Sequence, residues 1–119
     1  MTKIILVRHG QTSWNLEKKY QGQSDIELSP LGILQAEKVG ERLSSEKIDA
    51  VYASDLSRAF KTAAYIAIKH NLPVKTVPQL REIRFGLWEG LTFTEINAQW
   101  QDEFEKMFLY PDEVQIPEG

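Results

Sequence analysis

Alternation between apolar runs and amphipathic stretches constrains the fold of this chain more than any other feature. Ile4 to Val7 is a continuous, mostly β-branched apolar run, and Ile48 to Ala53 and Val74 to Val77 are two further candidate strands. Residues 30–43 and 55–70, which separate them, carry apolar residues at helical spacing. This order predicts a parallel α/β domain, which we expect to be a three-layer α/β/α sandwich with a mostly parallel sheet.

Capping residues predict where the helices begin and end. Ser29-Pro30 is typical of an N-cap followed by proline in the first turn. Ser54-Asp55 is expected to cap a second helix that ends near His70, before Pro73. A third helix is predicted from Thr92 to about residue 108, and residues 11–27 and 80–90 are expected to be mostly loop.

Length and composition exclude several classes of function. The chain has 119 residues, enough for one domain, and its net charge of −3 points to neither nucleic acid nor an anionic membrane as partner. It has no cysteine and only two histidines, far apart in sequence, so no metal ligand cluster is expected and a metal-dependent hydrolase is disfavoured. No apolar stretch is long enough for a signal peptide or a membrane span, and we expect a cytoplasmic protein.

Polar residues follow the first predicted strand directly. Arg8 offers a planar fork of donors suited to phosphate, and His9 can act as a base, a nucleophile or a metal ligand. Gly10 lets a ligand approach the backbone, and Asn15 adds a neutral donor. Taken alone, this segment is more often a solvated loop at the end of a strand, because a short motif is only a hypothesis.

Three other segments could contribute to the same chemistry. Arg58 is predicted in the first turn of a helix, where backbone N–H groups and the helix dipole also favour an anion. Glu82 stands beside an apolar run and could serve as a general acid if its surroundings raise its proton affinity. Tyr20-Gln21-Gly22-Gln23 is a weaker candidate for substrate contacts. Each segment can also be explained without a function. The Arg58 segment can be a capped helix with a surface arginine, Glu82 a surface carboxylate, and the segment around Gly22 a turn.

Together these segments resemble the histidine phosphatase superfamily, also called the phosphoglycerate-mutase-like family. The matching motifs run from residue 3 to residue 90 and are Arg8-His9-Gly10 with Asn15, Ser54-x-x-x-Arg58 with Thr62-Ala63, Leu80-x-Glu82, and Gly86-x-x-Glu89-Gly90. The stretch from Arg84 to Thr92 is more similar to the small phosphatases of the family, which include α-ribazole-phosphate phosphatase, than to the glycolytic mutases.

The resemblance implies a role for each matching residue. It implies that His9 attacks phosphorus and becomes phosphohistidine, and that Glu82 donates a proton to the leaving oxygen and later activates water. It implies that the phosphoryl group and the rest of the substrate are held by Arg8, Arg58, Asn15, Gln21 and Gly22. It implies no metal and no cofactor, and a small phosphorylated metabolite as substrate.

The chain departs from the family in one respect. Family members carry a second histidine in a His-Gly motif of their C-terminal half, and the remaining histidine here, His70, lies outside any such motif. His70 is expected to interact with the end of its own helix. We therefore expect residues 1–119 to be a single, truncated domain that lacks the part with the second histidine.

Three functions remain open from the sequence. The leading one is a phosphomonoester hydrolase, and the nearest alternative is a phosphoglycerate mutase with the same first step. The third is a truncated, non-catalytic protein that binds a phosphorylated ligand or a partner, with self-association through an exposed sheet edge.

Overall fold

The computed structural model describes all 119 residues. A small parallel sheet lies at one end of the molecule. Strands β1 (Val51–Ala53) and β2 (Val74–Thr76) pair in parallel, with Val51 opposite Val74. Between them runs helix α3 (Ser57–Ile68), which packs against both strands. The core of this unit is made of small residues: Val51, Ala53, Ala63 and Ala67. The predicted α/β class with a parallel sheet is confirmed.

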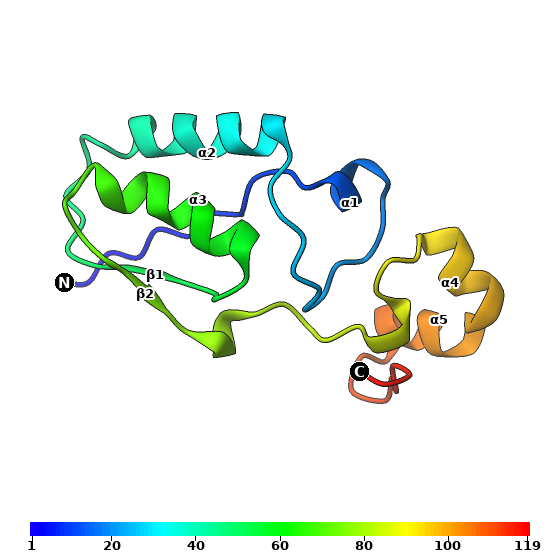
Figure 1. Cartoon of the computed structure of the whole chain (residues 1–119). Coiled ribbons are helices and arrows are strands. Elements are labelled where there is room, and N and C mark those ends of the chain that lie inside the picture. The colour runs from blue at the N-terminus through cyan, green and yellow to red at the C-terminus, as the bar shows by residue number, and fades with distance from the viewer.

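Helix α2 (Pro30–Arg42) packs along α3 and begins where the sequence predicts (Figure 1). The hydroxyl of Ser29 accepts a hydrogen bond from Gly32 N at 3.1 Å, and Pro30 occupies the first turn. Its buried face is formed by small residues, namely Gly32, Ala36 and Gly40. Small side chains let the two helices approach closely.

The predicted strand at Ile4–Val7 is wrong. None of the backbone groups of this segment makes a hydrogen bond to another backbone group. Its side chains are exposed, with Ile4 at 78% and Leu6 at 91%. A buried parallel strand requires backbone hydrogen bonds to a neighbouring strand and side-chain packing on both faces. Residues 4–7 have neither.

The second predicted helix is shorter than expected. Its N-cap is Leu56 rather than Ser54 or Asp55, and it ends at Ile68. Ser54 instead accepts a hydrogen bond from Leu56 N, and Asp55 forms an ion pair with Arg81 at 2.5 Å. Both polar side chains therefore fix the turn before the helix.

A second unit lies at the other end of the molecule and contains helices α4 (Phe93–Gln99) and α5 (Gln101–Leu109) (Figure 1). The sequence predicted one helix here, but the chain leaves helical geometry at Trp100, with φ −134° and ψ 47°. The break lets Ile96 and Phe104 pack together on the fully buried Trp88. The sequence left the cap of this helix open between Thr92 and Thr94, and the structure has Thr92, through a capping box with Glu95.

Three shorter elements complete the fold. Helix α1 (Ser13–Leu16) interrupts the predicted loop that precedes α2, and 3-10 turns cover Pro78–Leu80 and Gly86–Trp88. No helix of the chain is both long enough and apolar enough to cross a bilayer.

Backbone contact between Gly10 and Gly32 fixes α2 against the segment that carries His9. A Cβ added to Gly32 would lie 2.0 Å from the carbonyl oxygen of Gln11, and one added to Gly10 would lie 2.4 Å from the carbonyl oxygen of Gly32. Both atoms met are backbone atoms, so relief would require the two elements to move apart. Only glycine fits at either position.

We predict that Gly32→Ala destabilises the fold by about 1–3 kcal/mol, because overpacking forces the backbone to shift. Glycine-to-alanine changes inside helices usually stabilise by about 0.4–1 kcal/mol. A fall in the free energy of unfolding would therefore itself indicate the close backbone contact. The measurement is urea unfolding followed by circular dichroism, with the exposed Glu37→Ala on the same helix as control. A Gly32→Ala midpoint at or above that of the parent would contradict the close contact.

Candidate functional site

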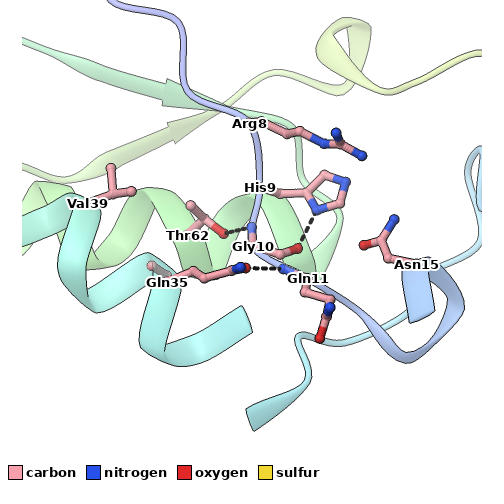
Figure 2. A pocket seen from close by; sticks show the side chains of 9 residues that line it. Arg8, His9, Gly10, Gln11, Asn15, Gln35, Val39 and Thr62 are labelled. Carbon is pink, nitrogen blue, oxygen red and sulfur yellow. Dashed lines mark hydrogen bonds between the residues drawn. The ribbon is translucent and has the colours of Figure 1, made fainter. Parts of the chain in front are cut away.

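His9 is held in one tautomer by its own backbone. Its Nδ1 lies 2.6 Å from the carbonyl oxygen of Gly10, and a carbonyl can only accept, so Nδ1 carries the proton (Figure 2). The lone pair of the neutral ring is then on Nε2. The ring is half-buried, at the end of the extended N-terminal segment. This arrangement suits a nucleophile, because the unprotonated nitrogen faces away from the backbone.

Arg8 and Asn15 lie on the same side of the chain as the His9 ring (Figure 2). Arg8 is exposed, so its guanidinium is available to a ligand. The Oδ1 of Asn15 accepts from Thr12 N at 2.9 Å, which closes a capping box on α1 and leaves the amide NH₂ group free. Asn15 therefore presents a donor, as the sequence predicted for an anion site.

Arg58 is buried at the start of α3, with 3% of its surface exposed. Its Nη1 donates to Ser24 O at 2.5 Å and its Nη2 donates to Gly22 O at 2.6 Å. Burial lowers the pKa of Arg58 from its ordinary value, while the carboxylates of Asp25, Glu82 and Glu89 oppose that shift. The side chain thus joins α3 to the 22–24 loop as well as bringing a positive charge to the site.

The N-terminus of α3 does not face an anion site as expected. A carboxylate of the protein already occupies it, because Asp25 Oδ1 accepts from Ser57 N at 2.7 Å. The sequence could not indicate this pairing, since Asp25 comes from the loop before α2. The positive groups that border this part of the structure are therefore the exposed Arg8 and the buried Arg58 rather than the helix end.

Gln21 and Gly22 lie in the loop that Arg58 holds. The Oε1 of the buried Gln21 is 2.6 Å from the hydroxyl of Thr12, which donates to it. Gly22 has φ +54°, and a Cβ there would lie 2.8 Å from Glu89 Oε2. Glycine is favoured at this point because φ is positive and because the same Cβ would lie 2.9 Å from the backbone oxygen of Ile83.

Glu82 lies at the surface rather than against the apolar side chains that the sequence suggested. Its Oε1 accepts from Ile83 N at 3.3 Å, and its carbonyl oxygen accepts from Gln23 Nε2 at 3.4 Å. The segment after it is tied back to the 22–24 loop, since Glu89 accepts from both the Ser24 hydroxyl and Phe85 N. Glu82 is therefore on an anchored loop with a solvent-accessible carboxylate.

One cavity of about 1630 Å³ brings the predicted site residues together. It extends from the N-terminal segment over β1 and the start of α3, and a smaller pocket of about 350 Å³ adjoins it beside α2. The large cavity is bordered by every residue predicted from the sequence, namely Arg8, His9, Asn15, Gln21, Gly22, Arg58 and Glu82. Charges of both signs that are distant in sequence thus share one space.

His70 lies outside both cavities. Its Nε2 is 2.9 Å from the carbonyl oxygen of Leu43, at the end of α2, to which it donates. The partner that the structure shows for His70 is thus the end of the neighbouring helix α2, and an interaction with the end of its own helix stays a prediction. No group of three or more acidic or histidine side chains is arranged to hold a metal ion.

Two residues of the site were given no role from the sequence, although Thr62 belongs to one of the matching motifs. Thr62 donates to Arg58 O at 2.7 Å and accepts from Gly10 N at 3.1 Å, and Gln35 accepts from Gln11 N at 2.9 Å (Figure 2). Thr62 is four residues after Arg58 and so on the same helix face, which is a usable signal. Gln35 had no comparable signal.

The surroundings of His9 predict a pH dependence. Burial lowers the pKa of His9 below its ordinary 6.5, Arg58 and Arg8 lower it further, and the bond to Gly10 and the charge of Glu82 oppose the shift. Cations and desolvation both disfavour imidazolium, so the ring stays neutral to lower pH. We predict that the NMR titration midpoint of His9 lies below that of the urea-unfolded chain, and that Arg8→Gln raises it. A midpoint at or above the unfolded value would contradict the described environment.

Comparisons with known proteins agree with one another. Residues 4–119 match the family model described as "Histidine phosphatase superfamily (branch 1)". Phosphoglycerate mutase-like protein 4 of Arabidopsis thaliana is 45% identical over 98% of this chain and 52% of its own length. Phosphoserine phosphatase 1 of Hydrogenobacter thermophilus is 36% identical over 100% of this chain and 56% of its own length.

Solved structures give the same result. Phosphoserine phosphatase from Entamoeba histolytica, in complex with 3-phosphoglyceric acid, superposes with a TM-score of 0.80 at 39% identity over 92% of this chain and 53% of that one. An Escherichia coli protein assigned as an α-ribazole-5′-P phosphatase gives 0.82 at 29% identity over 95% and 57%. The chain spans about half the length of the relatives it matches.

Proposed function

The chain belongs to the histidine phosphatase superfamily, and on that basis we propose that it forms the nucleophilic half of a phosphomonoester hydrolase that works through phosphohistidine on His9. The observation that carries the proposal is the single cavity bordered by His9, two arginines and Glu82. The relatives of this chain include a phosphoserine phosphatase and a phosphoglycerate mutase-like protein, and hydrolysis is the reaction that we propose for it.

The proposed reaction has two steps. First, Nε2 of neutral His9 attacks phosphorus, a P–N bond forms, and the P–O bond to the leaving alcohol breaks as Glu82 donates its proton to that oxygen. Next, the Glu82 carboxylate takes a proton from water, which attacks phosphorus and breaks the P–N bond. Inorganic phosphate leaves, and both residues return to their starting states.

The positive groups have a separate task in this proposal. Charge is spread over the three equatorial oxygens during phosphoryl transfer, so catalysis depends on positioned cations and donors. Arg8 and the amide of Asn15 are free to bind those oxygens, and Arg58 supplies a buried charge beside them. Gln21 and Gly22, on the loop that Arg58 holds, are proposed to contact the rest of the substrate. No metal is required by this scheme.

We further propose that residues 1–119 are one part of a longer, single domain. The radius of gyration is 16.4 Å, whereas a compact domain of this length is expected near about 13–14 Å. The exposed apolar side chains of Ile4 and Leu6 border the large cavity, and we propose that further chain covers these side chains and leaves the space beside His9 to the substrate. That further chain would also supply the second histidine of the family.

Substrates are proposed to be small phosphorylated metabolites, in keeping with the 3-phosphoglyceric acid bound to the Entamoeba histolytica relative. Such metabolites are abundant in the cytoplasm, where we place the protein. The test is to offer the full-length protein 2-phosphoglycerate and 3-phosphoglycerate separately and to measure both products. Release of phosphate faster than interconversion supports a hydrolase, and faster interconversion supports the mutase.

A second candidate function rests on the exposed N-terminal segment. Ile4 to Val7 offers unpaired backbone groups and apolar side chains, so the 119-residue chain is suited to self-association or to pairing with another segment without turnover. Sedimentation of the parent and of Leu6→Lys tests this. A concentration-dependent dimer that is lost in the variant, with no phosphate release, supports binding alone.

A further inference from the structure

We propose that Thr62 and Gln35 are positioning residues that hold the two peptide groups on either side of Gly10 and thereby select the tautomer of His9. This inference deepens the proposed function, because it names what keeps Nε2 of His9 unprotonated. It rests on three hydrogen bonds drawn together in Figure 2, two made by Gly10 O and Gly10 N and the third by Gln11 N.

The first peptide group joins His9 to Gly10. Its N–H donates to the Thr62 hydroxyl at 3.1 Å, and that hydroxyl donates in turn to Arg58 O at 2.7 Å. Thr62 is buried, with 4% of its surface exposed. Because a hydroxyl has one proton, donation to Arg58 leaves only its oxygen to face Gly10, so the direction of both bonds is fixed.

The second peptide group joins Gly10 to Gln11. Its N–H donates to Gln35 Oε1 at 2.9 Å, and its carbonyl oxygen is the acceptor for His9 Nδ1 at 2.6 Å. In a trans peptide the N–H and C=O point in opposite directions. An acceptor on α2 therefore turns the carbonyl toward the imidazole.

The pair of bonds matters because the residue between them is glycine. Glycine has more backbone freedom than any other residue, so the direction of its carbonyl is weakly set by its own conformation. Two side chains from α2 and α3 remove that freedom. If either bond is lost, the carbonyl is free to rotate away, and the proton of neutral His9 is no longer confined to Nδ1.

The test is ¹⁵N NMR of the histidine rings at about pH 8.5, roughly two units above the ordinary pKa, where the rings are neutral. His70 is an internal reference, because its Nε2 donates to Leu43 O and so has the opposite tautomer. The variants are Thr62→Val and Gln35→Met, which remove the acceptors. The matched controls are Thr62→Ser and Gln35→Glu, which keep them.

We expect His9 to carry its proton on Nδ1 in the parent and both controls, and to gain Nε2–H population in Thr62→Val and Gln35→Met. Unchanged His70 signals identify variants that remain folded. Gln35 is exposed, so its variants keep the test valid if Thr62→Val does not fold. A folded Gln35→Met with the parental His9 tautomer, or a parent with Nε2–H on His9, would overturn the inference.

The kcat and KM of the full-length protein provide a second, separate test. Loss of one hydrogen bond of about 1 kcal/mol corresponds to a roughly fivefold fall in kcat, with KM unchanged because no substrate contact is removed. The NMR result does not depend on turnover. If the proposed hydrolase activity is absent, the tautomer measurement still decides the positioning role.

Discussion

Replacing His9 with alanine is expected to reduce phosphate release from a phosphomonoester by at least about 10⁴-fold, because the covalent route then has no nucleophile. The hydrogen bond from Nδ1 to Gly10 O leaves Nε2 unprotonated, and no other histidine borders the cavity to take the place of this ring. The measurement is phosphate release from para-nitrophenyl phosphate by the full-length protein, together with acid-quenched detection of acid-labile phosphate on the protein.

His70→Ala is the matched control, because it removes the other histidine of these residues at a site outside the cavity. It is expected to keep labelling and turnover, apart from any loss of stability. Labelling that persists in His9→Ala, or a rate within about tenfold of the parent, would remove His9 from the nucleophilic role. Both variants should be compared at equal folded fraction, measured by circular dichroism.

Local signals predicted the elements that are stabilised by local interactions. The start of α2 was predictable because Ser29 and Pro30 carry their own capping chemistry. The same holds for α4, where Thr92 and Glu95 form a capping box. The parallel pairing of β1 with β2 follows from the helix between them, which leaves few other topologies.

Elements that depend on distant partners were predicted less well. The apolar run at Ile4–Val7 has strand propensity, but no neighbouring chain pairs with it here. The break at Trp100 depends on packing of Ile96 and Phe104 against Trp88, which comes from an earlier turn. Asp55 was expected to cap α3, but Arg81 outcompetes that local role with an ion pair at 2.5 Å. In each case a tertiary contact decides the outcome.

The site shows the same division between residue identity and geometry. Sequence motifs gave the residues that border the cavity, because each motif marks a chemical group near the end of an element. They could not give the connections between the loops. Arg58 bonds to two backbone carbonyls of the 22–24 loop, and backbone acceptors have no sequence signature. Those hydrogen bonds fix the position of the 22–24 loop relative to His9 and are visible only in the structure.

Glu82→Gln is the second variant expected to have a large effect, and the effect should depend on the leaving group. A general acid contributes typically about 10²–10⁴-fold, and it does so where the departing oxygen needs a proton. An alkyl phosphate, whose alkoxide is a poor leaving group, should lose about that factor. Para-nitrophenyl phosphate releases a stable phenolate and should lose much less in the first step.

The comparison also separates the two roles proposed for Glu82. If Glu82 activates water as well, phosphoenzyme should accumulate in Glu82→Gln with para-nitrophenyl phosphate, because His9 still attacks but hydrolysis of the P–N bond slows. Glu95→Gln, a carboxylate that caps α4 away from the cavity, is the control for charge loss. Equal losses for both substrates would show that Glu82 only binds or orients. The structure would agree with that outcome. The carboxylate of Glu82 is exposed and its one hydrogen bond, to Ile83 N at 3.3 Å, does not direct it toward a leaving oxygen.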